Sequence, residues 1–373
     1  MGQNDPVSTE VAIVGAGAIG LCVGHLLARS GRSVTLIDPT PGRGAIWAAA
    51  GMLAPASEAH FGHEALVPLL SKAASRWPEF VAELGGTEDD LGFRETGCLV
   101  VGADAGDRDE LARIERLQRT LGLEVEDLSR AELEALEPAL APHLRFGLRL
   151  PRDHQVDPRR VVARLLERLS QEGASLLEDS VVRVERGAAL SLVLAGGSTL
   201  RAAQVVLCPG AHLEQLEGLD ELALPFIRPV KGHVLRLAGP PLLTHTIRAT
   251  VRGRSVYFVP RGDGSLVIGA TTEERGFDTR VQAGEVHRLL DDARRVVPGV
   301  DELELVEVSV GLRPGSPDDA PTLAAFDEHR VVVALGHHRN GVLLAPLSAE
   351  VVVALLDGRD HPDLKLYLDS HQR

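Results

Sequence analysis

A glycine-rich turn between two apolar runs constrains the fold of this chain more than any other feature. Gly15, Gly17 and Gly20 form the pattern G-x-G-x-x-G directly after the β-branched run 11–14. In a strand–turn–helix unit the first glycine permits a tight turn, the second lets the backbone approach a pyrophosphate, and the third lets helix and strand pack closely. The helix N-terminus favours the negative charge of phosphates. The loop residues expected there are Gly15, Ala16, Gly17, Ala18, Ile19 and Gly20.

An acidic residue follows at the spacing that this kind of site requires. Asp38 ends the second apolar run, close to the interval of about 20 residues expected for a carboxylate that binds a ribose hydroxyl. The alternative is a glycine-rich turn with a chance acid. However, strand, turn, helix, second strand and acid occur here in the right order. The sequence therefore predicts a dinucleotide-binding α/β fold around this stretch.

Length, charge and cysteine content limit the remaining possibilities. The 373 residues predict two domains, and the net charge of −14 argues against nucleic acid or an anionic membrane surface as a partner. Cys22, Cys98 and Cys208 are too widely spaced to indicate a zinc site or a disulfide framework. His337 and His338 have no acid or cysteine at ligand spacing, so no metal is expected. We expect neither a signal peptide nor a run of ~18 apolar residues, which favours a cytoplasmic protein.

The secondary structure changes character along the chain. Helices are predicted at 66–84 and 158–172, and 204–208 reads as a buried parallel strand. Residues 225–305 instead hold short strands between Gly, Pro and Asp turns, a pattern typical of an antiparallel sheet. We therefore expect a mixed α/β (α+β) fold in which a substrate-binding domain interrupts a Rossmann-type domain. The Rossmann-type domain would contain residues 9–90, 145–224 and 306–373, and the substrate-binding domain residues 91–144 and 225–305.

Loops that follow predicted strands hold the candidate functional residues. The strand 204–208 ends in a Pro-Gly-Ala turn, so Gly210 should bring a second backbone turn toward the ligand of the first glycine loop. Arg313, between glycines and a proline, suits bidentate capture of a carboxylate, and a salt bridge is the alternative. Arg339 lies in a similar glycine-bounded loop. The small residues of 48–55 fit either a backbone lying against a flat ligand or a packed helix.

The sequence resembles the glycine oxidases, flavoenzymes of the D-amino-acid oxidase superfamily associated with thiamine biosynthesis. The resemblance spans nearly the whole chain and changes the expected cofactor from NAD to FAD. No cysteine follows Cys208, which excludes a covalent tether of the sarcosine-oxidase kind, so we expect the FAD to be non-covalent. The stretches that carry the resemblance keep the same order: the glycine turn, AAAGMLAP (48–55), VDP (156–158), VKG (230–232), YFVPRGDGSLVIGAT (257–271), GLRPGSPD (311–318) and GHHRNGVLLAP (336–346).

The resemblance implies roles for individual residues. The ADP half of FAD would be held by the glycine loop and Asp38, with backbone contacts to the adenine from Val181. The flavin would be lined by Ala49, Ala50, Gly51 and Met52. Its pyrimidine end would be approached by the backbone of Arg339, Asn340, Gly341, Val342 and Leu343. In the substrate pocket Arg313 would pair with the carboxylate and Tyr257 would hydrogen-bond it, with Arg339 and Met52 close by.

Two departures from the family pattern leave contacts open. Ile46 stands where many relatives carry Ser or Thr, so a hydroxyl contact to the cofactor is in doubt. Thr272 stands where a relative presents methionine toward the substrate, so the side-chain preference is in doubt as well. The exposure of Cys98 is also left open by the sequence.

The resemblance implies oxidation of glycine by FAD, with hydride leaving the α-carbon and oxygen reduced to peroxide. Iminoacetate would feed thiazole assembly. Orientation of the substrate supplies the catalysis, so no side-chain base is required if the amine binds neutral. Alternatives are a D-amino-acid or sarcosine oxidase or dehydrogenase, a non-catalytic flavin-binding module, and an NAD-dependent dehydrogenase. The expected partners are a small amino acid, oxygen and further copies of the chain, in a homo-oligomer such as a tetramer.

Overall fold

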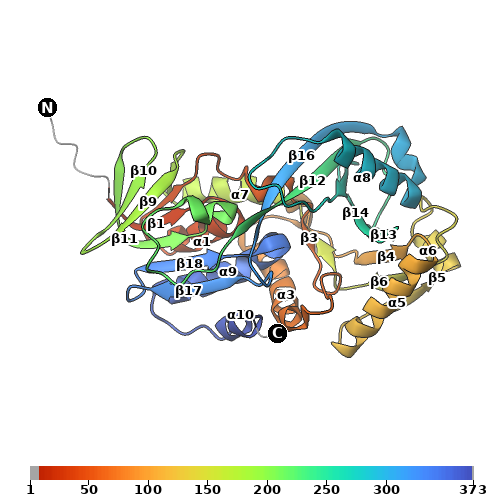
Figure 1. The fold of residues 1–373 in the computed structure, drawn as a ribbon, viewed down its shortest axis with the longest axis horizontal. Helices are drawn as coiled ribbons and strands as arrows, with labels where there is room; N and C mark the ends of the chain where they lie inside the picture. Colours follow the sequence, from red (N-terminus) through yellow and green to blue (C-terminus); the bar gives the residue numbers. More distant parts are fainter. Residues whose placement is uncertain (1–7, 372–373) are drawn as a thin grey trace. The chain divides into compact units, whose positions relative to one another are not determined.

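The computed structural model describes residues 8–371, which form two compact units with a large sheet in each (Figure 1). Among the described residues, the first unit contains 8–47, Val161–Val230 and 312–371. The second contains Ala48–Arg160 and Lys231–Gly311. Residues 48–90 and 145–160, which the sequence analysis assigned to the Rossmann-type domain, lie in the second unit. They lie there because β3 (Met52–Leu53) pairs with β7 (His154–Gln155).

The first unit contains the Rossmann-type sheet that the sequence predicts. Its strand order is β17-β18-β11-β1-β2-β8, and the pairs β18–β11, β11–β1, β1–β2 and β2–β8 are parallel. Strands β9 and β10 extend it as an antiparallel hairpin on β11. Every residue of β2 is buried, as expected where both faces of a parallel sheet are covered. The strands are β1 (Ser8–Val14), β2 (Val34–Ile37), β8 (Ser175–Leu177), β9 (Val181–Arg186), β10 (Leu190–Leu194), β11 (Thr199–Leu207), β17 (Thr322–Phe326) and β18 (Val331–Leu335).

Helix α9 (Gly341–Leu356) is the most apolar helix of this unit and packs against α1 (Ala18–Arg29). Within residues 8–371, His338–Leu356 is the one stretch with the length and hydropathy of a membrane span, although the sequence analysis expected none. Of its most apolar window, 72% is buried inside the structure, as in the core helix of a folded unit. The other helical segments here are α2 (Ala45–Ala48), η2 (Gly210–Gln215), α7 (Pro158–Gln171), η4 (His338–Asn340) and α10 (Leu364–Asp369).

The second unit is organised around a mainly antiparallel sheet, also as predicted. Its strand order is β16-β12-β15-β14-β13-β4-β6-β5, and β13 with β4 is a parallel pair within it. The strands are β4 (Cys98–Gly102), β5 (Glu126–Ser129), β6 (Phe146–Leu150), β12 (Arg228–Ala238), β13 (Thr246–Val251), β14 (Arg254–Pro260), β15 (Leu266–Gly269) and β16 (Glu304–Gly315). The helical segments are η1 (Glu64–Leu66), α3 (Val67–Glu83), α4 (Glu88–Leu91), α5 (Ala105–Thr120), α6 (Arg130–Leu136), α8 (Ala283–Val296) and η3 (Pro298–Glu302).

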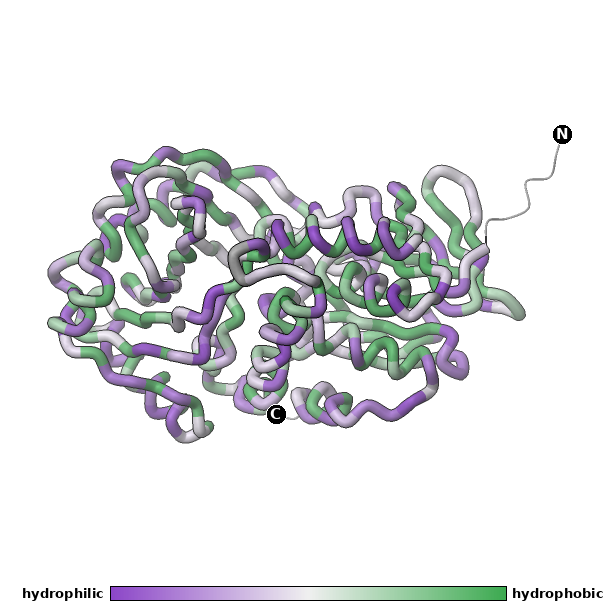
Figure 2. Tube along the Cα trace, turned by 180° about the vertical axis from the view of Figure 1, so that it is seen from behind, coloured by the Kyte–Doolittle hydropathy of each residue, from purple (hydrophilic) through white to green (hydrophobic). Residues whose placement is uncertain are grey.

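The two faces of this second sheet have different partners, because side chains alternate along each strand. Leu235, Phe258 and Ile268 belong to a cluster with Leu289 and Ala293 of α8. Their neighbours Val234, Val259 and Val267 instead form a separate cluster with Ala50. The hydrophobic stretches of both units alternate with hydrophilic turns and helix faces in Figure 2. The register of β12, β14 and β15 therefore decides which residues lie on the side of the 49–52 segment.

Candidate active site

The glycine loop has the geometry that a pyrophosphate requires. A Cβ on Gly15 (φ +99°) would lie 2.2 Å from the Cys208 carbonyl oxygen, and one on Gly20 would lie 1.9 Å from the Gly15 oxygen. These two glycines are therefore demanded by packing. A Cβ on Gly17 would meet nothing within 4 Å, so the backbone there faces open space. Gly17 is the N-cap of α1 and offers no side-chain cap, which leaves the first N–H groups of the helix for an anion.

Asp38 lies directly against this loop. One carboxylate oxygen, Oδ2, accepts a hydrogen bond from Ala16 N at 2.8 Å, and Oδ1 accepts one from Thr40 N at 2.8 Å. An ionised carboxylate has about four acceptor positions, so lone pairs remain for ribose hydroxyls. The space at Gly17, the N–H groups of α1 and this acid together fit the ADP half of FAD.

The structure brings two further predicted cofactor residues to the same end of the sheet. Cys208 N donates to Val14 O at 2.9 Å, which places the turn that contains Gly210 beside the glycine loop. Gly210 has φ +60° and begins η2. Val181 packs in one hydrophobic cluster with Val14 and Ile37, the last residues of β1 and β2. Contacts of Gly210 and Val181 with the cofactor stay predictions.

The two arginine loops lie side by side in the first unit. An antiparallel bridge joins Gly315 to His337, so the end of β16 that follows Arg313 runs next to the turn that precedes Arg339. Arg339 and Asn340 belong to η4, and Gly341, Val342 and Leu343 form the first turn of α9. The positive end of the α9 dipole thus points out of the segment predicted to approach the flavin.

His337 supports this loop from within the unit. Burial lowers its pKa to about 3, so the ring is neutral. Its Nε2 lies 2.9 Å from Ser348 Oγ, which in turn lies 2.8 Å from the Tyr367 hydroxyl. A neutral, buried, hydrogen-bonded imidazole has a structural role here. Among residues 8–371, no group of three or more His, Cys, Asp or Glu side chains is arranged to hold a metal ion.

In the second unit, the structure brings Met52 and Tyr257 to one hydrophobic cluster, where both pack against Ala50, Val234, Val259 and Val267. Tyr257 pairs with Gly269 across β14 and β15. A Cβ on Gly269 would lie 2.3 Å from the Tyr257 hydroxyl oxygen, so this glycine makes room for the phenol. Of the predicted substrate residues, Arg313 and Arg339 therefore belong to the first unit, and Tyr257 and Met52 to the second.

The 48–55 segment is not the continuous packed helix that was one of the two alternatives left open by the sequence. Helix α2 ends at Ala48, and β3 begins at Met52. Ala50 and Gly51 are buried, whereas Ala49 and Met52 are half-buried. Contacts of Ala49, Ala50, Gly51 and Met52 with the flavin stay predictions. Ile46 is buried in α2 and carries no hydroxyl.

Sequence reasoning missed two buried charged residues beside this segment. Arg261 is 7% exposed and donates from Nη2 to Ala50 O at 2.6 Å. Asp153 is fully buried and accepts from Ala56 N at 2.9 Å, from Ser57 N at 2.8 Å and from the Ser57 hydroxyl. Burial raises the pKa of Asp153 to about 6 although these hydrogen bonds oppose the shift. One feature of the sequence could have pointed to Arg261: it is a charged residue that directly follows the apolar run 257–260.

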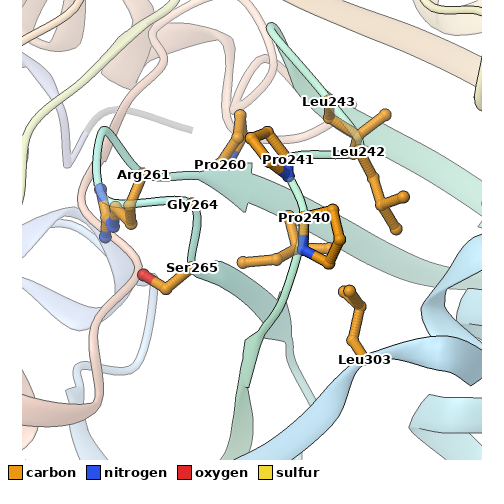
Figure 3. A pocket seen from close by; sticks show the side chains of 10 residues that line it. Pro240, Pro241, Leu242, Leu243, Pro260, Arg261, Gly264, Ser265 and Leu303 are labelled. Carbon is orange, nitrogen blue, oxygen red and sulfur yellow. The ribbon is translucent and has the colours of Figure 1, made fainter.

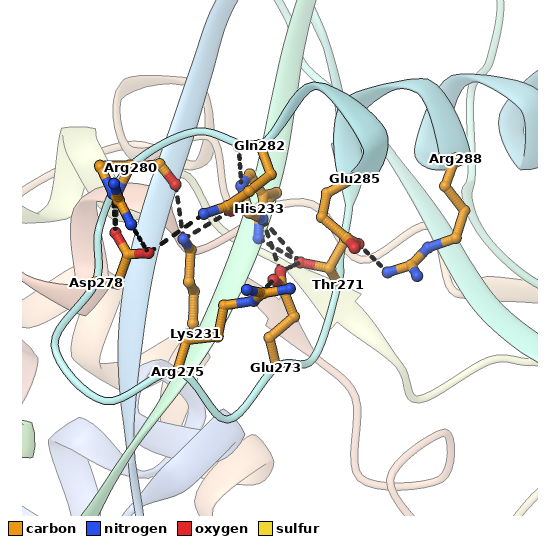
Figure 4. Close-up of polar contacts among 10 residues, drawn as sticks. All are labelled: Lys231, His233, Thr271, Glu273, Arg275, Asp278, Arg280, Gln282, Glu285 and Arg288. Atoms are coloured by element: carbon orange, nitrogen blue, oxygen red, sulfur yellow. Dashed lines mark hydrogen bonds and ion pairs between the residues drawn. The ribbon is translucent and has the colours of Figure 1, made fainter.

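The VKG motif anchors a loop. Lys231 is fully buried, and its Nζ donates to Arg280 O at 2.6 Å and to Gln282 Oε1 at 2.7 Å (Figure 4). His233 Nε2 accepts from Gln282 N at 3.2 Å, so the proton is on Nδ1, which lies 2.9 Å from Glu273 Oε1. These contacts fold residues 271–282 onto β12. Thr272, at the start of the loop, is exposed.

Two other features do not contribute to the candidate site. Cys98 is 1% exposed, and burial raises the pKa of its thiol to about 12, so it is not a reactive cysteine. A small pocket in the second unit is walled mainly by proline and leucine (Figure 3). Its one charged lining residue is Arg261, whose guanidinium binds Ala50 O.

Comparisons with known proteins agree with this geometry. The family described as FAD dependent oxidoreductase (DAO) matches residues 10–355. Glycine oxidase from Geobacillus kaustophilus is 35% identical over 357 residues, covering 94% of this chain and 93% of that protein. The crystal structure of glycine oxidase from that organism superposes with a TM-score of 0.87 at 34% identity, covering 95% of this chain and 96% of that one.

Two further relatives extend the comparison. Iminodiacetate oxidase from Chelativorans superposes with a TM-score of 0.84 at 26% identity, covering 95% of this chain and 96% of that one. A bifunctional ThiO/ThiG protein from Trichormus variabilis is 29% identical over 359 residues, 93% of this chain. The chain spans about half of that protein, 52% of its length.

Proposed function

Because this chain belongs to the family of FAD-dependent oxidoreductases, we propose that it oxidises glycine to the imino acid and reduces oxygen to hydrogen peroxide. The observation that carries the proposal is the match to glycine oxidase over almost the whole length of both chains, in sequence and in fold. FAD, when bound, supplies the oxidant that accepts the hydride equivalent of the α-carbon. The protein's own contribution is then binding and orientation.

Each proposed site residue has a defined task. Arg313 binds the substrate carboxylate through its planar fork of N–H donors, which fixes the direction of the α-carbon. Tyr257 donates a hydrogen bond to the same carboxylate. Arg339 lies near the substrate, and its backbone and that of Asn340–Leu343 offer N–H groups at the start of α9. Met52 and Ala49 form an apolar wall that keeps water from the reacting carbon.

The proposed biological role is the supply of an imino acid for thiazole assembly, in the cytoplasm and by a homo-oligomer. It is supported by the bifunctional ThiO/ThiG relatives and by a Rhizobium etli oxidoreductase whose name assigns it to thiamine biosynthesis. A secondary amine is the second candidate substrate, because iminodiacetate oxidase shares the fold at 26% identity. Sarcosine is a secondary amine as well, and small D-amino acids, which are primary amines like glycine, are further candidates.

A spectroscopic experiment tests the proposal. The visible spectrum of the purified protein is recorded, and the flavin band is followed without air after addition of glycine, sarcosine, iminodiacetate or D-alanine. Air is then admitted, and peroxide is measured. Bleaching by glycine with recolouring in air and stoichiometric peroxide is the expected result. Bleaching without rapid recolouring would indicate a dehydrogenase with another acceptor, and a colourless protein that takes up no added FAD would refute the flavoenzyme proposal.

A further inference from the structure

Two stretches that are far apart in the sequence, 49–52 and 155–158, meet at Gly51. Its φ of +74° suits glycine, and a Cβ there would lie 2.1 Å from Val156 O and 2.6 Å from Pro158 Cδ. Val156 N donates to Gly51 O at 2.9 Å, and Met52 pairs with Gln155 across the short sheet of β3 and β7. The 49–52 segment is therefore packed directly on the VDP stretch.

Arg261, at the end of β14, ties these two stretches together. Its Nη2 donates to Ala50 O at 2.6 Å, and its Nη1 donates to Val156 O at 3.0 Å and to Gln155 Oε1 at 3.2 Å. The nearest carboxylate oxygen, Asp157 Oδ2, is 4.0 Å from Nε. The guanidinium thus acts mainly as a rigid fork between backbone carbonyls of two segments.

The choice of arginine at this position is not explained by packing alone. Taking a cation out of water is costly, and an apolar side chain of similar volume often replaces a buried charge without loss of stability. Only the planar guanidinium offers several donors in fixed directions. A lysine in its place would present a point charge, and a methionine would leave the Ala50 and Val156 carbonyls without this donor.

We propose that Arg261 is a positioning residue that fixes the backbone of Ala49–Met52 for binding of the flavin ring. The proposal rests on the proposed function, since it takes this segment as the flavin wall. Arg261 acts through Ala50: the carbonyl that it holds lies between the two half-buried side chains, Ala49 and Met52, that the segment presents. When the hydrogen bonds of the Arg261 guanidinium are lost, the backbone of 49–52 can shift. FAD then binds more weakly, and the environment of the flavin ring changes.

The test compares Arg261→Met and Arg261→Lys with a matched control. Arg152→Met serves as the control, because Arg152 lies close in sequence to Gln155 but is 79% exposed and pairs with Glu124. The readouts are the FAD dissociation constant, from quenching of flavin fluorescence, and the visible absorbance and circular dichroism of bound flavin. We expect Arg261→Met to raise the FAD dissociation constant about 10- to 100-fold, as for loss of hydrogen bonds to a charged group. The FAD dissociation constant of Arg261→Lys should lie between those of Arg261→Met and wild type. That of Arg152→Met should be within about twofold of the wild-type value.

Several outcomes separate this proposal from a general stability effect. If Arg261→Met does not fold, Arg261→Lys keeps the buried charge and is scored on the same readouts. An unchanged FAD affinity and an unchanged flavin spectrum in a folded Arg261 variant would overturn the proposal, whatever the change in melting temperature. Wild-type protein that binds FAD and oxidises glycine in that experiment would leave the proposed function standing. Wild-type protein that takes up no FAD would instead refute the proposed function itself.

Discussion

Arg313 is the residue on which substrate binding should depend most. Arg313→Met removes charge-assisted hydrogen bonds of about 1.5–3 kcal/mol, so kcat/KM for glycine should fall by about 10- to 100-fold, mainly through KM. Arg313→Lys keeps the charge but not the fork and should recover only part of the loss. Steady-state kinetics, normalised to bound FAD, measure both. Arg359→Met, at an exposed arginine paired with Asp357, is the control. An unchanged KM in both Arg313 variants would contradict the assignment.

Asp153 should make stability depend on pH. Its pKa is raised by burial to about 6 in the folded chain, above the value of 3.8 for an exposed carboxyl group. The folded state therefore binds the proton more tightly than the unfolded chain does. As the pH rises from about 4 to about 6, the contribution of Asp153 to the free energy of unfolding falls, and above about pH 6 it is constant. Asp153→Asn removes this slope and should lower the melting temperature more at about pH 4.5 than at about pH 7.5. Equal losses at the two pH values would contradict the prediction.

At the scale of single residues, the sequence was informative where a residue acts through its immediate neighbours. Gly15, Gly17 and Gly20 could be assigned separate tasks because the turn itself requires them; packing distances explain Gly15 and Gly20, and Gly17 faces open space. Arg261 and Asp153 could not be assigned in this way. Their partners, Ala50 and Ser57, are brought to them only by the pairing of β3 with β7 and by the register of β14.

Among the elements, the loop 271–282 should depend on Lys231. Lys231→Met removes a buried cation that donates to Arg280 O and Gln282 Oε1, so the loop should open more often. We expect amide hydrogen exchange in 272–282 to rise by about 10-fold or more, as for lost hydrogen bonds of 1.5–3 kcal/mol. Arg288→Met, which removes a half-exposed ion pair with Glu285, should leave the loop unchanged. Faster exchange spread evenly over the second unit would contradict a local anchor.

The elements show where sequence patterns suffice. Helix α7 (Pro158–Gln171) closely matches the helix predicted at 158–172, and β13, β14 and β15 are short strands within 225–305, as predicted. Helix α9 runs from Gly341 to Leu356 with Pro346 inside it, so the loss of one helical hydrogen bond at this proline does not end the helix. Strand β5, with the sequence EDLS, was not predicted at all. It is an edge strand whose charges are exposed, and pairing with β6 alone makes it a strand.

For the whole molecule, removal of FAD should lower stability in a concentration-dependent way. A ligand at 100 times its dissociation constant stabilises the folded state by about 2.7 kcal/mol, which for units of this size corresponds to about 5–10 °C in melting temperature. Thermal unfolding of the protein stripped of flavin and titrated with FAD measures the effect. FMN lacks the AMP part of FAD, and with it the adenosine ribose and one of the two phosphates that Asp38 and the glycine loop are predicted to bind, so it should stabilise far less. A melting temperature that does not respond to FAD would contradict the prediction.

The order of strands in the first unit has a consequence for biosynthesis. Strand β1 lies between β2 and β11, and β11 ends at the Cys208 turn that closes the glycine loop. A ribosome adding 5–20 residues per second reaches β11 about 10–40 s after β1. During that interval β1, an interior strand of the finished sheet, lacks one of its two neighbouring strands. The emerging chain is therefore accessible to chaperones and proteases. A slow stretch of codons between β2 and β11 would lengthen this exposure, whereas one after β18 would not.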